Sequence, residues 1–177
     1  MVRRIFLLVL VTGMLFDCMG HEEVYRQRKA MREGWPPEIL GYYADEVIRP
    51  GETWKVYLRF IDRDCDMTYI VADLTQAGFG SYPVSFTQIK ETGCQEVKGY
   101  IFLNTPLDQY LRWDQFELKV LIRDRRGNRS KPLFFPLSFG MSSEDNLPES
   151  WQVAAEKPLG PMRFDLMSSQ RLQSGGS

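Results

Sequence analysis

The sequence predicts an all-β fold, an antiparallel sandwich of seven strands over residues 38–139. Short runs in which apolar and polar residues alternate recur along this region, with the period of two expected for half-buried strands. Clusters of turn-forming residues separate these runs. No stretch of useful length in this region has the period of an amphipathic helix. Seven such runs in about 100 residues are typical of a β-sandwich.

The turns set the order of the elements. Residues 49–52 (Arg-Pro-Gly-Glu) end the first strand region, and residues 124–130 reverse the chain before the last strand. The connection 105–114 is expected to hold a helical turn. Pro136 cannot donate to a ladder, so the last strand should lie at an edge there. The predicted strands are 39–48 (one strand or a broken pair), 53–62, 67–75, 84–90, 97–104, 116–123 and 133–139.

The end of this region resembles a known class of domain. Residues 120–130 (Val-Leu-Ile-Arg-Asp-Arg-Arg-Gly-Asn-Arg-Ser) combine a hydrophobic strand with an Asp/Gly-Asn turn that leads into a final strand. In this feature residues 38–139 resemble a bacterial immunoglobulin-like or fibronectin-III-like domain. The resemblance implies an immunoglobulin-like antiparallel sandwich with a structural or binding role, and it supplies no catalytic residues.

Residues 1–20 have the build of an export signal. Arg3 and Arg4 precede an apolar run over residues 5–16, which is shorter than the roughly 20 residues that a transmembrane helix needs. A polar linker over residues 21–37 follows. The protein is therefore expected to be exported, to the periplasm or the cell surface.

The cysteine that ends this signal predicts a membrane anchor. Residues 15–18 (Leu-Phe-Asp-Cys) resemble a bacterial lipobox, in which Leu precedes two small residues and the cysteine that receives lipid. Leu15 and Cys18 match this pattern, whereas Phe16 and Asp17 depart from it. The resemblance implies lipidation of Cys18 and a membrane partner. The alternative is ordinary cleavage after Gly20, which would release a secreted protein.

The other two cysteines are predicted to form a disulfide. In a seven-strand sandwich, the loops after the second, fourth and sixth strands gather at one end. Cys65 and Cys94 lie in the first two of these loops, in a compartment that permits disulfides. The bond would stabilise the fold by about 3 kcal/mol. Two separate thiols are the alternative.

The same end carries an acidic loop and a basic loop. Asp62, Asp64, Asp66 and Asp73 have a spacing that partly resembles a calcium loop, but Met67 occupies the position where the sharp turn needs Gly. A solvated turn with no metal is therefore predicted. The basic residues of the loop after the sixth strand should lie beside these carboxylates and offset their charge.

A glycine-rich segment, residues 76–83, carries Phe79 and Tyr82. Exposed aromatic side chains bind sugars and protein partners, so this pair is a candidate contact for a glycan or a partner protein. After residue 139, Ser, Pro, Glu, Gln and Gly dominate the sequence. Residues 140–177 are therefore predicted to form a flexible tail.

Composition excludes several classes of function. With 22 basic and 23 acidic side chains, the chain lacks the cationic surplus of a nucleic-acid-binding protein. The single histidine, His21, precedes the domain, so no histidine-dependent triad or metal site is expected within it. No cofactor is predicted. The prediction is a non-enzymatic, envelope-anchored interaction or structural module. A secreted glycan-binding module is the alternative, and an enzyme would need an unrecognised pair of carboxylates.

Overall fold

A computed structural model describes residues 34–90, 94, 96–141 and 147–167. The chain divides into two compact units, Met1–Trp35 and Pro36–Ser177. Among the described residues, the main hydrophobic core lies in the second unit, so the chain from Pro36 onward carries a core of its own. The predicted signal, most of the linker and Cys18 lie outside the described residues. Within the described part of the chain, no helix has the length and apolarity needed to cross a bilayer.

The first sheet has four strands. Its neighbours pair antiparallel except at one edge, where the C-terminal strand β10 runs parallel to β7. In spatial order the strands are β1 (Glu38–Ala44), β3 (Thr53–Ile61), β7 (Val97–Asn104) and β10 (Pro158–Pro161).

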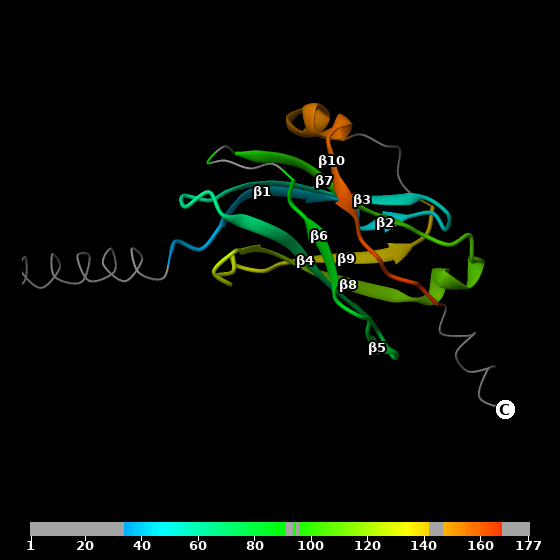
Figure 1. Cartoon of the computed structure of the whole chain (residues 1–177). Coiled ribbons are helices and arrows are strands. Elements are labelled where there is room, and N and C mark those ends of the chain that lie inside the picture. The colour runs from blue at the N-terminus through cyan, green and yellow to red at the C-terminus, as the bar shows by residue number, and fades with distance from the viewer. Residues whose placement is uncertain (1–33, 91–93, 95, 142–146, 168–177) are drawn as a thin grey trace, which may run out of the picture. The chain divides into compact units, whose positions relative to one another are not determined.

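The second sheet lies against the first, as Figure 1 shows. Its long strands are antiparallel, and the short strands β5 and β6 both pair with the edge of β4. In spatial order the strands are β2 (Val47–Ile48), β9 (Leu133–Phe139), β8 (Gln115–Asp124) and β4 (Met67–Gln76), followed by β5 (Gly80–Ser81) and β6 (Ser85–Gln88).

This arrangement confirms the predicted all-β, immunoglobulin-like sandwich. The strand count differs, because the described residues form ten strand segments instead of seven. The first predicted strand is a broken pair that joins both sheets, and the carbonyl oxygen of Asp45 in the break accepts a hydrogen bond from Trp54 Nε1 at 2.8 Å. Pro136 lies at an edge as predicted, because β2 pairs only with Ser138 and Phe139 of β9.

The core fills the space between the sheets. Alternate residues of each long strand point inward, which is the period-two pattern of the sequence realised in space. The largest side chains with less than 2% exposure include Trp54, Phe60, Ile70, Leu74, Ile101, Leu118 and Ile122.

The predicted helical turn in the connection between β7 and β8 is confirmed as the 3-10 helix η1 (Gln109–Trp113). The Asp108 carboxylate caps it by accepting a hydrogen bond from the Tyr110 amide at 3.0 Å. Leu111 anchors the helix in the core, with 0% of its surface exposed.

The predicted flexible tail is wrong for residues 147–167, which belong to the fold. The 3-10 helix η2 (Glu149–Glu156) packs Trp151 against Tyr57, with ring centroids 6.0 Å apart. Strand β10 follows, and the chain then buries Met162, Phe164 and Leu166 along the side of the sandwich. These three side chains alternate along an extended segment. The alternation is too short for the sequence to distinguish the segment from a loop.

Glycine at position 99 permits the close approach of this segment. A Cβ atom there would lie 2.5 Å from the carbonyl oxygen of Lys157, inside van der Waals contact. The Tyr100 amide instead donates a hydrogen bond to that oxygen at 3.0 Å. The C-terminal segment therefore depends on a close fit to the edge of β7.

Candidate binding face

The two sheets differ in how their outer faces are covered. On the first sheet, η2 lies over the aromatic residues Tyr57 and Tyr100, and Trp151 and Ala154 of η2 are buried. On the second sheet, Phe86 and Phe134 keep 51% and 54% of their surface exposed. The chain's own C-terminal segment thus covers one face, while large apolar side chains remain exposed on the other.

We call the outer surface of β6, β4, β8 and β9 the open face. Cross-strand pairing builds it, because Val71 of β4 lies opposite Phe86 of β6 on one side and Leu121 of β8 on the other. Tyr69 meets Phe86 edge to face, with ring centroids 6.0 Å apart. The open face consists of Tyr69, Val71, Asp73, Val84, Phe86, Lys119, Leu121, Arg123, Arg129 and Phe134.

A pocket of about 230 Å³ lies within this face. Apolar side chains from β4, β6 and β8 form part of its wall, and its charged lining comprises Lys119, Arg123, Arg129 and one carboxylate, Asp73. Asp73 lies directly opposite Lys119 in the β4–β8 ladder. Neither Arg123 nor Arg129 makes an ion pair with another described residue. The pocket therefore combines an apolar wall with an excess of positive charge.

The open face is a site that the sequence did not predict. A signal for it does exist, because Val71 and Leu121 sit inside continuous apolar runs (Ile70-Val71-Ala72 and Val120-Leu121-Ile122) instead of strict alternation. Such runs indicate strands with apolar contacts on both faces. Which runs share one surface depends on the register of β4 and β8, which the sequence alone does not fix.

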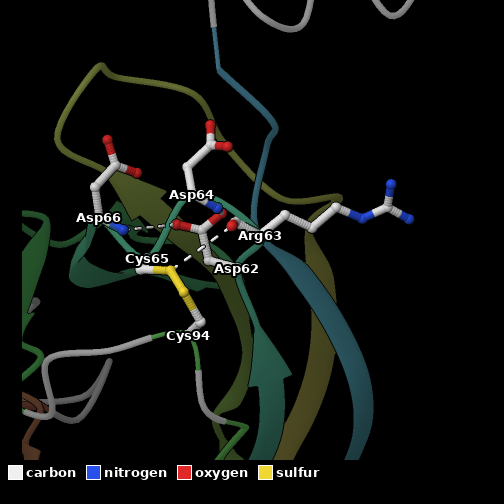
Figure 2. Close-up of a disulfide and its surroundings, with 6 residues drawn as sticks. All are labelled: Asp62, Arg63, Asp64, Cys65, Asp66 and Cys94. Carbon is white, nitrogen blue, oxygen red and sulfur yellow. Dashed lines mark hydrogen bonds between the residues drawn. A yellow bond between two sulfur atoms is a disulfide. The ribbon is translucent and has the colours of Figure 1, made fainter.

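The predicted disulfide joins Cys65 to Cys94, whose Cα atoms are 4.4 Å apart. Figure 2 shows the bond linking the acidic loop to the segment before β7. Cys65 occupies the left-handed region with φ 61°, which is unusual for a residue other than glycine. The loop arrangement inferred from the sandwich topology is thus confirmed at this end.

Replacing both Cys65 and Cys94 by Ser is expected to lower the free energy of unfolding by about 3 kcal/mol, because the bond closes a long loop in the unfolded chain. The measurement is urea denaturation of the variant beside the parent protein. Reduced parent protein should behave like the double variant. An unchanged urea midpoint in both samples would contradict the assignment of a stabilising role to the bond.

The calcium-like carboxylates do not converge. Asp62 is buried, and its carboxylate accepts hydrogen bonds from the backbone amides of Asp66 at 3.0 Å and Asp64 at 3.5 Å. Figure 2 shows the bond from Asp66. Asp73 lies within β4, about 20 Å along the strand from Asp66. No group of three metal-ligating side chains in the described residues could hold an ion. The carboxylate of Asp62 instead shapes the loop by accepting its backbone amides.

The basic loop lies beside the acidic loop, as expected. Arg126 Nε is 3.6 Å from Asp66 Oδ2, and the Arg125 amide donates to the Asp66 carbonyl at 2.8 Å. Burial raises the pKa of the Asp66 carboxyl, and the charges of Asp124 and Asp62 raise it further, while Arg126 acts in the opposite direction. Asp66 Oδ1 is buried without a hydrogen-bond partner.

Asp66→Asn is expected to keep or raise stability at neutral pH. A carboxyl whose pKa is raised by folding stabilises the fold at low pH and loses that contribution as pH rises through the folded-state pKa. The variant removes this loss of stability, while the ion pair that Asp66 makes with the half-exposed Arg126 is worth only about 1 kcal/mol. Thermal melting of both proteins from about pH 4 to pH 7 should show the variant gaining relative to the parent as pH rises. A relative loss would contradict the raised pKa.

The aromatic pair in the glycine-rich segment does not form an exposed platform. Phe79 and Tyr82 lie together, with ring centroids 5.3 Å apart, but only Phe79 is exposed and Tyr82 retains 7% of its surface. The Tyr82 hydroxyl donates to Gln76 Oε1 at 2.5 Å and accepts the Met167 amide at 3.3 Å. Burial raises the pKa of this hydroxyl. Tyr82 therefore secures the C-terminal segment, because its hydrogen bonds hold residue 167 against β4.

The sequence matches no known protein family and no curated protein. Solved structures with similar β-architecture include the sporulation control protein Spo0M from Bacillus subtilis, at 10% identity and a TM-score of 0.41. That match covers 61% of this chain and 51% of Spo0M, so the chain spans about half the length of that protein.

Two further solved structures are smaller domains. A PKD domain of an M14-like peptidase from a Thermoplasmatales archaeon has 12% identity and a TM-score of 0.36, over 59% of this chain and 96% of that domain. A CARDB domain from Pyrococcus furiosus, solved with two metal ions, has 9% identity and a TM-score of 0.32, over 59% and 86%. These likenesses do not assign a function.

Proposed function

We propose that this chain is a non-catalytic binding module of the cell envelope, exported by residues 1–20, whose open face binds an apolar and acidic segment of another protein. The observation that supports it is the contrast between the two sheets. The outer face of one sheet is covered by η2, whereas the other leaves Phe86 and Phe134 half exposed beside a cationic pocket. Exposed apolar surface of this kind is typical of an interaction site.

The charges indicate what the partner presents. The pocket holds three cationic side chains and one carboxylate, so a segment with Asp or Glu side chains would complement it. Arg123 and Arg129 carry planar guanidinium groups, which form bidentate hydrogen bonds with carboxylates. Phe86, Val84 and Leu121 would bury the apolar residues of the same segment. A strand or extended peptide with alternating acidic and apolar residues meets both requirements.

The described residues give little basis for catalysis at this face. Asp73 is the one carboxylate that lines the pocket, whereas hydrolysis by carboxylates needs a pair. The buried carboxylate of Asp62 lies at the disulfide end and is engaged by backbone amides. Binding is the activity that the geometry supports best.

The test is co-purification from native envelopes solubilised in mild detergent. A tagged parent chain should retain a partner that is lost when Phe86→Asp and Arg123→Glu are combined. Val153→Asp serves as the control, because Val153 is 83% exposed on η2, away from the open face. Equal recovery of the same proteins by the open-face variant and by the control would refute the proposal.

We propose further that the module is anchored through lipid on Cys18, which lies outside the described residues. The intact mass of protein purified from native membranes decides between the two processing routes. A diacylglycerol or triacyl adduct on a chain that begins at Cys18 would support the anchor. A bare polypeptide that begins at His21 would show a secreted module instead.

A further inference from the structure

The end of the sandwich opposite the disulfide carries several protruding apolar side chains, which we call the apolar tip: Leu107, Tyr110, Trp113 and Met141. Leu107 and Met141 each expose 89% of their surface, and Trp113 exposes 77%. The first three come from the connection between β7 and β8, and Met141 follows β9. Leu107, Trp113 and Met141 therefore project further from the surface than Phe86 and Phe134 of the open face, while Tyr110 is 43% exposed.

The backbone beneath the tip is held in place by the core. Leu111 is fully buried in the middle of η1, and Asp108 caps the helix, so the flanking side chains are fixed outward. Thr105 ties the connection to the β2–β3 turn through its hydroxyl, which donates to the Glu52 carbonyl at 2.7 Å. Gly51 lies directly under Leu107 with φ 88°, and a Cβ there would come within 2.9 Å of the Leu107 side chain.

Cationic side chains flank the tip. Arg49 and Arg112 line a groove of about 960 Å³ together with Leu107, Tyr110 and Met141. The carboxylate in that lining, Asp108, is buried and accepts the Tyr110 amide. Glu52 pairs with Arg49, with 3.7 Å between Arg49 Nε and Glu52 Oε1. Arg112 is exposed beside the apolar side chains and makes no ion pair with another described residue.

We infer that the apolar tip inserts into the interface of a membrane that contains anionic lipids. Trp and Tyr favour the level of the headgroups, while Leu and Met reach the acyl chains, and this is the composition of the tip. Arg112 and Arg49 would meet headgroup phosphates, an attraction that strengthens binding to anionic surfaces.

This inference is independent of the proposed function, because the tip and the open face share no residue. The chain from Pro36 onward carries the tip and its own core but lacks Cys18, so lipid attached to that cysteine cannot explain its membrane binding. In the chain from Pro36 onward, Trp54 and Trp151 are buried and Trp113 is exposed. Trp113 can therefore report membrane contact by its fluorescence.

The experiment is flotation of residues 36–177 with vesicles of phosphatidylethanolamine and phosphatidylglycerol, combined with quenching of tryptophan fluorescence by brominated lipid. The protein should float and its emission should be quenched, and Trp113→Phe should remove the quenching. Leu107→Asp should weaken binding by about tenfold or more, since it removes one aliphatic side chain that the membrane would bury. Arg112→Gln should weaken binding to these vesicles and leave any residual binding to phosphatidylcholine unchanged.

Val153→Asp is the matched control, because it places the same charge at an equally exposed apolar position on η2 and should float like the parent. Thermal melting of each variant confirms that the fold is retained. Failure of the parent to float, or equal flotation of Leu107→Asp and Val153→Asp, would overturn the inference. Quenching that persists in Trp113→Phe would overturn it as well.

Discussion

A chain that ends at Met141 is expected to lose most of its stability, because residues 147–167 supply part of the core. Trp151, Met162, Phe164 and Leu166 are each at least nine-tenths buried. Burying one such side chain contributes about 1.5–3 kcal/mol, against a total stability of about 5–15 kcal/mol for a domain. The shortened chain also exposes Tyr57 and the edge of β7, which η2 and β10 cover.

Urea denaturation measures this effect. A chain that ends at Met167 is the control, because it keeps every described residue of the C-terminal segment. The single variant Phe164→Ala should fall between the two, with a loss of about 3 kcal/mol. If the chain that ends at Met141 unfolds at the parental midpoint, the C-terminal segment contributes nothing to the fold.

A substitution at the opposite side of the same contact gives an independent test. Gly99→Val should displace the C-terminal segment without shortening the chain, because even a Cβ at position 99 would overlap the Lys157 carbonyl and the Leu159 side chain. Limited proteolysis should then cut the chain between β9 and β10 faster than in the parent. Combining Gly99→Val with the truncation at Met141 should cost little more than the truncation alone.

The second large effect is expected at the open face. Phe86→Asp combined with Arg123→Glu should weaken binding of the partner by about 100-fold, because it removes an aromatic side chain that the partner would cover and reverses a charge in the pocket. Both side chains are exposed in the unbound protein, so thermal stability should stay near the parental value.

The matched control combines Val153→Asp on η2 with Arg112→Glu at the apolar tip, which changes the net charge by the same amount. Titration of the purified partner into each protein gives the two affinities. Equal weakening by both double variants would mean that the loss reflects net charge and not the open face.

Local patterns in the sequence predicted the sandwich well. Strands β8 and β9 alternate clearly, and their turn residues bound them, so their positions follow from short-range chemistry. The disulfide was also predictable, since the order of strands brings the loops of Cys65 and Cys94 to one end.

The C-terminal segment was not predictable in the same way. Pro158 lies opposite Tyr100, far away in sequence, and the parallel pairing of β10 with β7 has no turn signature. Its apolar residues are too few to mark a strand by periodicity. The segment is ordered by its contact with β7, which is far away in sequence, although its own composition is typical of a flexible tail.

For the candidate sites too, the sequence predicts the residue types, whereas the fold determines which of them are exposed. Phe79 and Tyr82 were recognised as a pair, but only the fold shows that Tyr82 is buried by Phe116 and Phe164. The open face requires three strands in register, with Val71 between Phe86 and Leu121. A side-chain class can be predicted from sequence, whereas its exposure depends on what the rest of the chain covers.

The most direct test of the binding role is site-specific photo-cross-linking in the native envelope. A photoreactive amino acid in place of Phe86 should give a discrete protein adduct, and mass spectrometry should map the link to an extended segment rich in Asp or Glu and apolar residues. The same group in place of Val153 should not give this adduct, and Arg123→Glu should abolish it. An identical set of adducts from positions 86 and 153, or none from position 86, would contradict the assignment of the open face as the binding site.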